Sequence, residues 1–122
     1  MAVSRTRAIL VVEDDAAMRH LLVEVLQEAG FLAGCAAGVE EALALLRLHD
    51  FDAVLSDVHM RDRSGFEILG ELNARDKRTR VVLMTSFASP DVVESARAAG
   101  AAGVLSKPFG EEQLLEVLEQ SS

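Results

Sequence analysis

The sequence has no tryptophan and no tyrosine, and its 122 residues include a single cysteine. Half of the residues are apolar, and the five phenylalanines are the only large aromatic side chains, so the core must be mainly aliphatic. Because Cys35 is alone, an internal disulfide is excluded, which is typical of proteins in a reducing cytoplasm. We expect Cys35 to be a small buried residue of a strand.

Basic residues and long apolar runs are also scarce. The 12 Lys and Arg against 20 Asp and Glu give a net charge of −8. This charge argues against direct nucleic-acid binding, because phosphate contacts need a basic face. No apolar run approaches the roughly 20 residues of a membrane span. We therefore expect a cytoplasmic chain without membrane contact, folded as one domain over residues 1–122.

Short apolar runs alternate regularly with amphipathic segments. The runs predict strands at 8–12, 31–36, 52–56, 80–84 and 102–106, each followed by a helix. The first helix carries its apolar side chains as one stripe: Met18, Leu21, Leu22, Val25, Leu26 and Ala29. This alternation predicts an α/β doubly wound fold with a five-stranded parallel sheet, because right-handed crossovers place helices on both faces.

Local signals mark the start of two helices. The segment from Ser64 to Glu67 has the pattern of a capping box, in which the hydroxyl and the carboxylate each accept a hydrogen bond from an end amide. Asp15 is placed to cap the first helix. Capping explains neither a second acid at the end of the central strand nor Lys107. A purely structural role for all these groups is therefore the weaker interpretation.

Four of the predicted strands end in a chemically active group. The first ends in Glu13-Asp14-Asp15, the central one in Asp57, the fourth in Thr85-Ser86 and the fifth in Lys107-Pro108. In open α/β sheets, ligands bind outside the carboxyl ends of the strands. The pattern therefore predicts that these groups converge on one site.

Glu13, Asp14 and Asp57 would place several negative charges in that site. Two like charges about 4 Å apart repel by roughly 4 kcal/mol at an effective dielectric constant of about 20, so the site needs a proton or a cation. Oxygen ligands suit a hard ion such as Mg²⁺. With Lys107 and a hydroxyl nearby, the site suits an incoming phosphoryl group. Asp57 stands alone and is therefore the best candidate nucleophile.

In this order and spacing, the motifs resemble the receiver domains of two-component response regulators. The resemblance is carried by residues 11–15, 55–60 with Gly65, 83–86 and 107–109. It implies a flavodoxin-like sheet of strand order 2-1-3-4-5. It also implies a phosphorylation-controlled signalling switch that catalyses only its own phosphorylation and dephosphorylation. The phosphoryl donor would be a sensor histidine kinase or a histidine phosphotransfer protein, and the recipient of the signal a downstream protein or an attached output domain.

The resemblance assigns the acidic residues to a phosphoacceptor and a metal site. Asp57 would accept the phosphoryl group. Asp14 and Asp57 would bind Mg²⁺ directly, and Glu13 would act mainly through a metal-bound water. The backbone carbonyl of His59 would supply a further ligand.

The same resemblance assigns the hydroxyl and amine groups to the phosphoryl group. Thr85, beside Ser86, would form a hydrogen bond with it and move when it arrives. Lys107 would pair with it. The bond between Lys107 and Pro108 is expected to be cis.

Three positions depart from the common family pattern. Arg61 replaces a frequent proline, so we expect a less rigid loop. Val104 replaces a frequent aromatic residue, which excludes a rotating tyrosine switch, and residues 102–104 lack the Asp-Asp-Tyr sequence of one class of dimers. Val104 is therefore a candidate for tuning the site, as are His59, two residues after Asp57, and Phe87, two residues after Thr85. Phe87 could shield the phosphoryl group from water or equally provide a hydrophobic contact for a partner. For His59, a solvent-facing side chain of which only the backbone matters is an equal alternative.

Two other functions remain open at this point. One is a Mg²⁺-dependent aspartyl-phosphate phosphatase, although Glu13-Asp14-Asp15 lacks the Asp-x-Asp spacing of haloacid-dehalogenase-type enzymes. The other is a phosphorylation-independent interaction module on the same fold. Retention of all the acidic, hydroxyl and amine groups argues against the second alternative.

Overall fold

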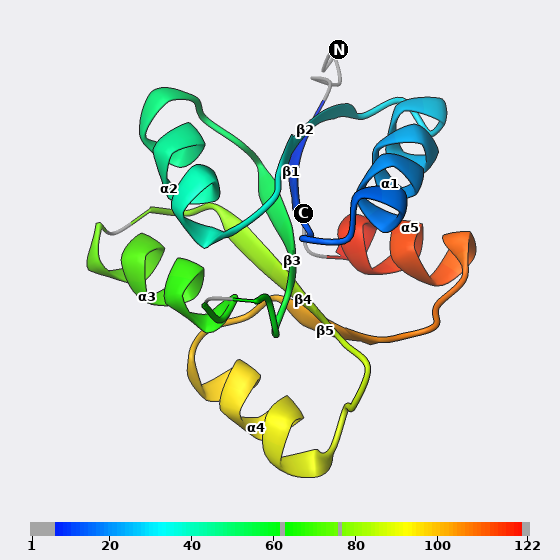
Figure 1. Cartoon of the computed structure of the whole chain (residues 1–122). Helices are drawn as coiled ribbons and strands as arrows, with labels where there is room; N and C mark the ends of the chain where they lie inside the picture. The colour runs from blue at the N-terminus through cyan, green and yellow to red at the C-terminus, as the bar shows by residue number, and fades with distance from the viewer. Residues whose placement is uncertain (1–6, 62, 76, 121–122) are drawn as a thin grey trace, which may run out of the picture.

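Five parallel strands form one central sheet in the order β2-β1-β3-β4-β5 (Figure 1). The computed structural model describes residues 7–61, 63–75 and 77–120. The elements along the chain are β1 (Ala8–Val12), α1 (Ala16–Glu28), β2 (Leu32–Ala36), α2 (Val39–Leu48), β3 (Ala53–Asp57), α3 (Phe66–Ala74), β4 (Arg80–Thr85), α4 (Pro90–Ala98), β5 (Gly103–Ser106) and α5 (Glu111–Gln120). The predicted doubly wound α/β fold and its strand order are confirmed.

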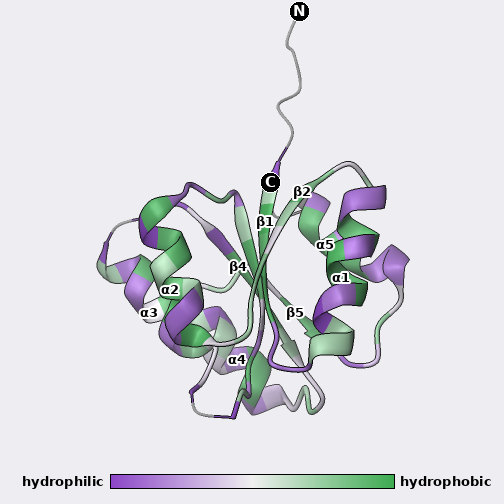
Figure 2. Cartoon of the chain, turned by 45° about the horizontal axis from the view of Figure 1, so that its top comes forward, coloured by the Kyte–Doolittle hydropathy of each residue, from purple (hydrophilic) through white to green (hydrophobic). Residues whose placement is uncertain are grey.

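The helices lie in two layers, with α1 and α5 on one face of the sheet and α2, α3 and α4 on the other (Figures 1 and 2). Successive strand residues point to opposite faces. Ile9 and Val11 therefore pack with α1 and α5, while Leu10 and Val12 pack with the second layer. In Figure 2, polar residues concentrate on the helices and loops around a largely apolar sheet.

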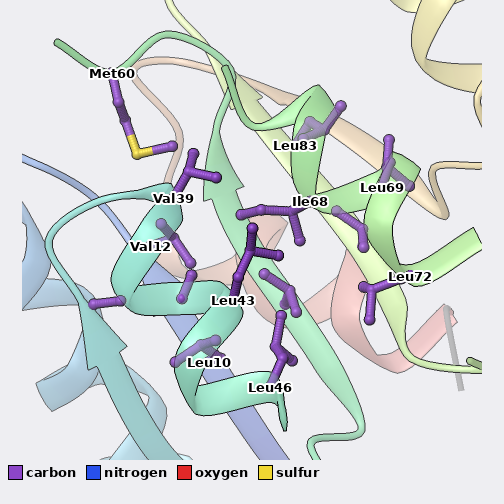
Figure 3. Packing of buried hydrophobic residues seen from close by; sticks show 14 of the residues in the cluster. Leu10, Val12, Val39, Leu43, Leu46, Met60, Ile68, Leu69, Leu72 and Leu83 are labelled. Atoms are coloured by element: carbon purple, nitrogen blue, oxygen red, sulfur yellow. The ribbon is translucent and has the colours of Figure 1, made fainter. Parts of the chain in front are cut away.

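The layer formed by α2 and α3 shows how the aliphatic core is built (Figure 3). Leu43 and Leu46 of α2 meet Ile68 and Leu72 of α3 over the strand residues, and all four are buried. Burying one such side chain contributes about 1.5–3 kcal/mol relative to leaving it in water. This packing fixes the strand ends from which the site is made.

The strand boundaries agree with the predictions to within one residue, and one of these shifts matters for the site. The central strand was predicted to stop at residue 56, but β3 includes Asp57 as its last residue. The Asp57 backbone is therefore held by the sheet, paired in register with Met84 of β4.

Two burial predictions are wrong. Cys35 lies in a strand, as expected, but its side chain is exposed, because β2 is one of the two edge strands and is only partly covered. Leu21 of the predicted α1 stripe is 54% exposed. Leu22 and Leu26 are the buried residues of α1, because only the centre of the stripe faces the sheet.

None of the helices in the described part of the chain combines the length and the apolar character that crossing a bilayer would require.

Candidate functional site

The carboxyl ends of β1 and β3 bring three acidic side chains together. Glu13 and Asp14 follow β1, and Asp57 ends β3. Each offers a carboxylate oxygen, and these three oxygens all lie within 4.8 Å of one another. The predicted convergence of these three residues is therefore present in the structure.

Lys107, which directly follows β5, reaches two of these acids. Its Nζ donates hydrogen bonds to Oδ2 of Asp57 at 2.8 Å and to Oε2 of Glu13 at 3.1 Å. Glu13 is 2% exposed and Asp57 is 9% exposed, so both ion pairs are largely shielded from water. One ammonium thus faces two buried carboxylates, and the cluster keeps an excess of negative charge.

Burial and this charge imbalance act on the proton affinities. The pKa of Glu13 is raised overall, mainly because the side chain is buried. The negative charge of Asp57 raises this pKa further, whereas the hydrogen bond from Lys107 lowers it. Partial burial would lower the pKa of Lys107, but its hydrogen bonds to Asp57 and Glu13 outweigh that effect and raise it. Lys107 is therefore a permanent cation at neutral pH.

The backbone around Asp57 is held from several sides. Ser56 Oγ donates to the Asp57 carbonyl oxygen at 3.0 Å, and the N–H of Val58 donates to the carbonyl of Met84 at 2.8 Å. Gly65 packs so closely that a Cβ there would overlap the Asp57 carbonyl oxygen. The position of the Asp57 side chain is thus fixed by its own strand and by the start of α3.

The loop between β3 and α3 is closed on itself. His59 and Ser64 form an antiparallel bridge, and the N–H of Met60 donates to the carbonyl of Arg63 at 3.1 Å. At its end, Glu67 accepts a hydrogen bond from the N–H of Ser64 at 3.1 Å.

Ser64 and Glu67 form the hydrogen bonds of the start of α3, but the N-cap residue is Gly65, so α3 begins one residue later than a capping box headed by Ser64 predicts. The Ser64 hydroxyl accepts a hydrogen bond from the N–H of Phe66 at 3.1 Å. The base of the loop that contains Arg61 is therefore tied by backbone and side-chain hydrogen bonds.

Two backbone amides of this loop point at the acidic cluster. The N–H of His59 donates to Oδ1 of Asp57 at 3.4 Å, and the N–H of Arg61 donates to Oδ2 of Asp14 at 3.0 Å. The second contact did not emerge from the sequence, because every residue except proline carries this donor. The His59 side chain is exposed.

Thr85 ends β4 beside the cluster and is 1% exposed. Its Oγ1 accepts a hydrogen bond from the N–H of Phe87 at 3.0 Å, and its carbonyl accepts one from the N–H of Lys107 at 2.7 Å. Ser86 is exposed, and Phe87 is 76% exposed. Thr85 and Ser86 therefore differ in burial and in position, because Thr85 is buried at the end of β4 and Ser86 is exposed after it.

The remaining predicted positions lie around β5. The peptide bond between Lys107 and Pro108 is cis, the isomer that the family resemblance implies. Val104 is half-buried and packs against the layer that contains α4. Its side chain thus fills part of the α4 side of the sheet.

The donor atoms of the cluster determine what it can hold. Three carboxylates supply only oxygen ligands, with no sulfur or imidazole among them, and Lys107 compensates only part of their charge. Such a set fits a hard divalent cation such as Mg²⁺. The buried hydroxyl of Thr85 and the ammonium of Lys107, which come from the ends of the neighbouring strands β4 and β5, suit oxyanions.

Comparison with known proteins gives a consistent result. The family model for the response regulator receiver domain matches residues 9–119. The transcriptional regulatory protein PdtaR of Mycobacterium tuberculosis is 39% identical over 114 residues, which make up 93% of this chain and 55% of that protein. The chain thus spans about half the length of this relative.

Solved structures resemble this fold closely. Chemotaxis protein CheY4 of Vibrio cholerae superposes with a TM-score of 0.91 at 32% identity, covering 97% of this chain and 100% of that one. The response regulator TrrA of Thermotoga maritima, solved in complex with Mg²⁺-BeF, superposes with a TM-score of 0.86 at 30% identity, covering 96% and 100% of the two chains.

Proposed function

The chain belongs to the response regulator receiver domain family, and we propose that it is a switch in which Asp57 accepts a phosphoryl group from a partner's phosphohistidine. The observation that carries the proposal is the placement of Lys107 Nζ 2.8 Å from Oδ2 of Asp57, at the edge of the acidic cluster. A lone structural acid needs no such arrangement.

The transfer exchanges one bond for another. A carboxylate oxygen of Asp57 attacks the phosphorus, and an oxygen–phosphorus bond forms. The phosphorus–nitrogen bond to the histidine breaks, its electron pair stays on the imidazole nitrogen, and that nitrogen takes a proton from solvent. The product is an aspartyl phosphate on the last residue of β3.

Lys107 and Thr85 stabilise the phosphoryl group once it is attached. The ammonium of Lys107 already lies within hydrogen-bonding distance of the Asp57 carboxylate, so it can pair with the phosphoryl oxygens. The Thr85 hydroxyl accepts the N–H of Phe87 and keeps its own proton free to donate. A phosphoryl group that recruits this proton therefore links β4 to the exposed Ser86–Phe87 segment.

Glu13, Asp14, Asp57 and the backbone carbonyl of His59 would hold Mg²⁺. When bound, the ion supplies positive charge that offsets the charge on the phosphoryl oxygens. The related TrrA, in its complex with Mg²⁺-BeF, supports this assignment. The residues of this chain contribute the oxygen ligands and the fixed orientation of Asp57 in the sheet.

The partners follow from this chemistry. We place the chain in the cytoplasm, with a sensor histidine kinase or a histidine phosphotransfer protein as phosphoryl donor. The recipient of the signal is a downstream protein or an attached output domain, in line with the greater length of PdtaR. Phosphorylation can change partner binding only to the extent that the contacts of the phosphoryl group favour one arrangement of the Thr85–Phe87 segment over another.

The proposal is tested by intact-mass analysis after incubation with a small phosphodonor and Mg²⁺. We expect one added phosphoryl group in the wild type and in Asp50→Asn, which removes a solvent-exposed carboxylate before β3. Asp57→Asn and the wild type in EDTA should gain none. A folded wild type that gains no phosphoryl group, even from a panel of histidine phosphotransfer proteins, would favour the phosphorylation-independent interaction module.

A further inference from the structure

We propose that the backbone amide of Arg61 is a positioning group that holds Asp14 for the cation, and that this role requires the N–H of residue 61 but not its guanidinium. The inference deepens the proposed function and rests on it, because it concerns the cation that the acidic cluster would bind.

Lys107 binds two of the three acids of the cluster, Glu13 and Asp57, and Asp14 has a different partner. Glu13 accepts hydrogen bonds from Lys107 and, at 3.3 Å, from the N–H of Asp15. Asp57 accepts them from Lys107 and His59. Within the described ranges, the Asp14 carboxylate accepts one hydrogen bond, from the N–H of Arg61. The orientation of Asp14 thus depends on a residue 47 positions further along the chain.

The loop geometry explains why this amide points at Asp14. Met60 anchors the loop, since its side chain is 9% exposed and lies beside Val39 of α2 (Figure 3). The N–H of Met60 donates a hydrogen bond to the carbonyl of Arg63, and the N–H of Gly65 donates one to the carbonyl of Val58. With its base closed in this way, the loop presents the next amide, that of Arg61, to the segment that follows β1.

The contact depends on the residue type at position 61 in one respect only. A proline there, as many receivers carry, has no N–H to donate. Any other residue keeps the donor. The Arg61 side chain is exposed, and the hydrogen bond to Asp14 uses only its backbone. The proposal therefore separates alanine from proline at this position.

The size of the effect follows from the behaviour of groups that orient metal ligands. Removing such a partner typically weakens metal binding by about 10- to 100-fold. Because Glu13 and Asp57 keep their own partners, we expect the lower end of this range, about 10-fold, for loss of the Arg61 N–H.

The experiment measures Mg²⁺ affinity by isothermal titration calorimetry in the wild type, Arg61→Ala and Arg61→Pro. Arg61→Ala should bind within about twofold of the wild type. Arg61→Pro should bind about 10-fold more weakly, or about 1.4 kcal/mol. Amide hydrogen exchange without Mg²⁺ supplies a second readout: the Arg61 amide should exchange about 10-fold more slowly in the wild type than in Asp14→Ala.

Several results would overturn the inference. Equal weakening in Arg61→Ala and Arg61→Pro would assign the effect to the guanidinium, and wild-type affinity in Arg61→Pro would remove the effect altogether. If Arg61→Pro does not fold, exchange of the Arg61 amide decides. Faster exchange of this amide in Asp14→Ala than in the wild type supports the inference, and equal exchange in the two proteins overturns it. A folded wild type that binds no Mg²⁺ would overturn both this inference and the proposed cation site. Equal binding by all three proteins would overturn the inference alone.

Discussion

Gly65 packs directly against the backbone carbonyl of Asp57. A Cβ at position 65 would overlap that oxygen and lie 2.8 Å from Oγ of Ser56. The site therefore needs a residue without a side chain at the start of α3, because neither the strand backbone nor the buried serine can move aside easily.

Gly65→Ala should consequently destabilise the protein by about 2 kcal/mol, within the range seen when a methyl group is forced into a packed site. Gly70→Ala is the matched control, because Gly70 lies inside α3 and nothing lies within 4 Å of its added Cβ. That variant should be stabilised by up to about 1 kcal/mol through helix propensity. Urea unfolding of both variants measures the difference, and a neutral Gly65→Ala would contradict the packing argument.

Lys107→Met should remove the counter-charge of two buried acids. We expect a loss of about 2–3 kcal/mol in the absence of Mg²⁺, because an unpaired buried carboxylate is costly. Lys77→Met is the control: its Nζ lies 3.7 Å from Asp50, which is 98% exposed, so its loss should cost less than about 1 kcal/mol. Equal losses in the two variants would show that the buried ion pairs of Lys107 contribute no more stability than the exposed pair of Lys77.

The stability of the wild type should depend on pH through Glu13. Burial raises its pKa in the folded state above the value in the unfolded chain. Its contribution to stability is therefore fully present below the unfolded pKa and is lost as the pH rises through the folded pKa. Glu13→Gln removes this loss, although its single amide oxygen can accept from only one of the two donors, the N–H of Asp15 or Nζ of Lys107.

Without divalent ions, Glu13→Gln should therefore gain stability relative to the wild type as the pH rises from about 4 to neutrality. The series begins at about pH 4 because that is below the ordinary glutamate pKa of about 4.3. Urea unfolding at several pH values in EDTA measures this difference. A difference between the two proteins that stays constant with pH would contradict the raised pKa of Glu13.

Thr85→Val should leave the N–H of Phe87 without its acceptor while keeping the shape of the side chain. We expect a loss of about 1 kcal/mol and faster amide exchange at Phe87. Thr85→Ser keeps the hydroxyl and should retain the protection of that amide. Equal protection in Thr85→Val and the wild type would mean that the hydroxyl does not hold the segment after β4.

Much of the fold and of the candidate site was predictable from the sequence. Parallel strands end at one edge of a sheet, so the position of Glu13, Asp57 and Lys107 directly at strand ends was enough to predict that they meet. The capping box before α3 was also readable, because it depends on residues close together in the chain.

The remaining features depend on tertiary neighbours that the local sequence does not encode. The pattern of Cys35 is that of a buried strand residue, and only the edge position of β2 exposes it. Leu21 has the spacing of a core residue, but it lies at the side of the α1 stripe. The hydrogen bond from Arg61 to Asp14 uses a backbone donor and therefore has no residue signature.

The long separations along the chain have a consequence for synthesis. Lys107 meets partners 94 and 50 residues before it, so the ammonium joins the acids only when β5 has been added to the sheet. A nascent chain that has released β1 and β3 but not β5 carries the carboxylates without this counter-charge. The complete ion-pair cluster therefore forms only when β5, the last strand along the chain, has joined the sheet.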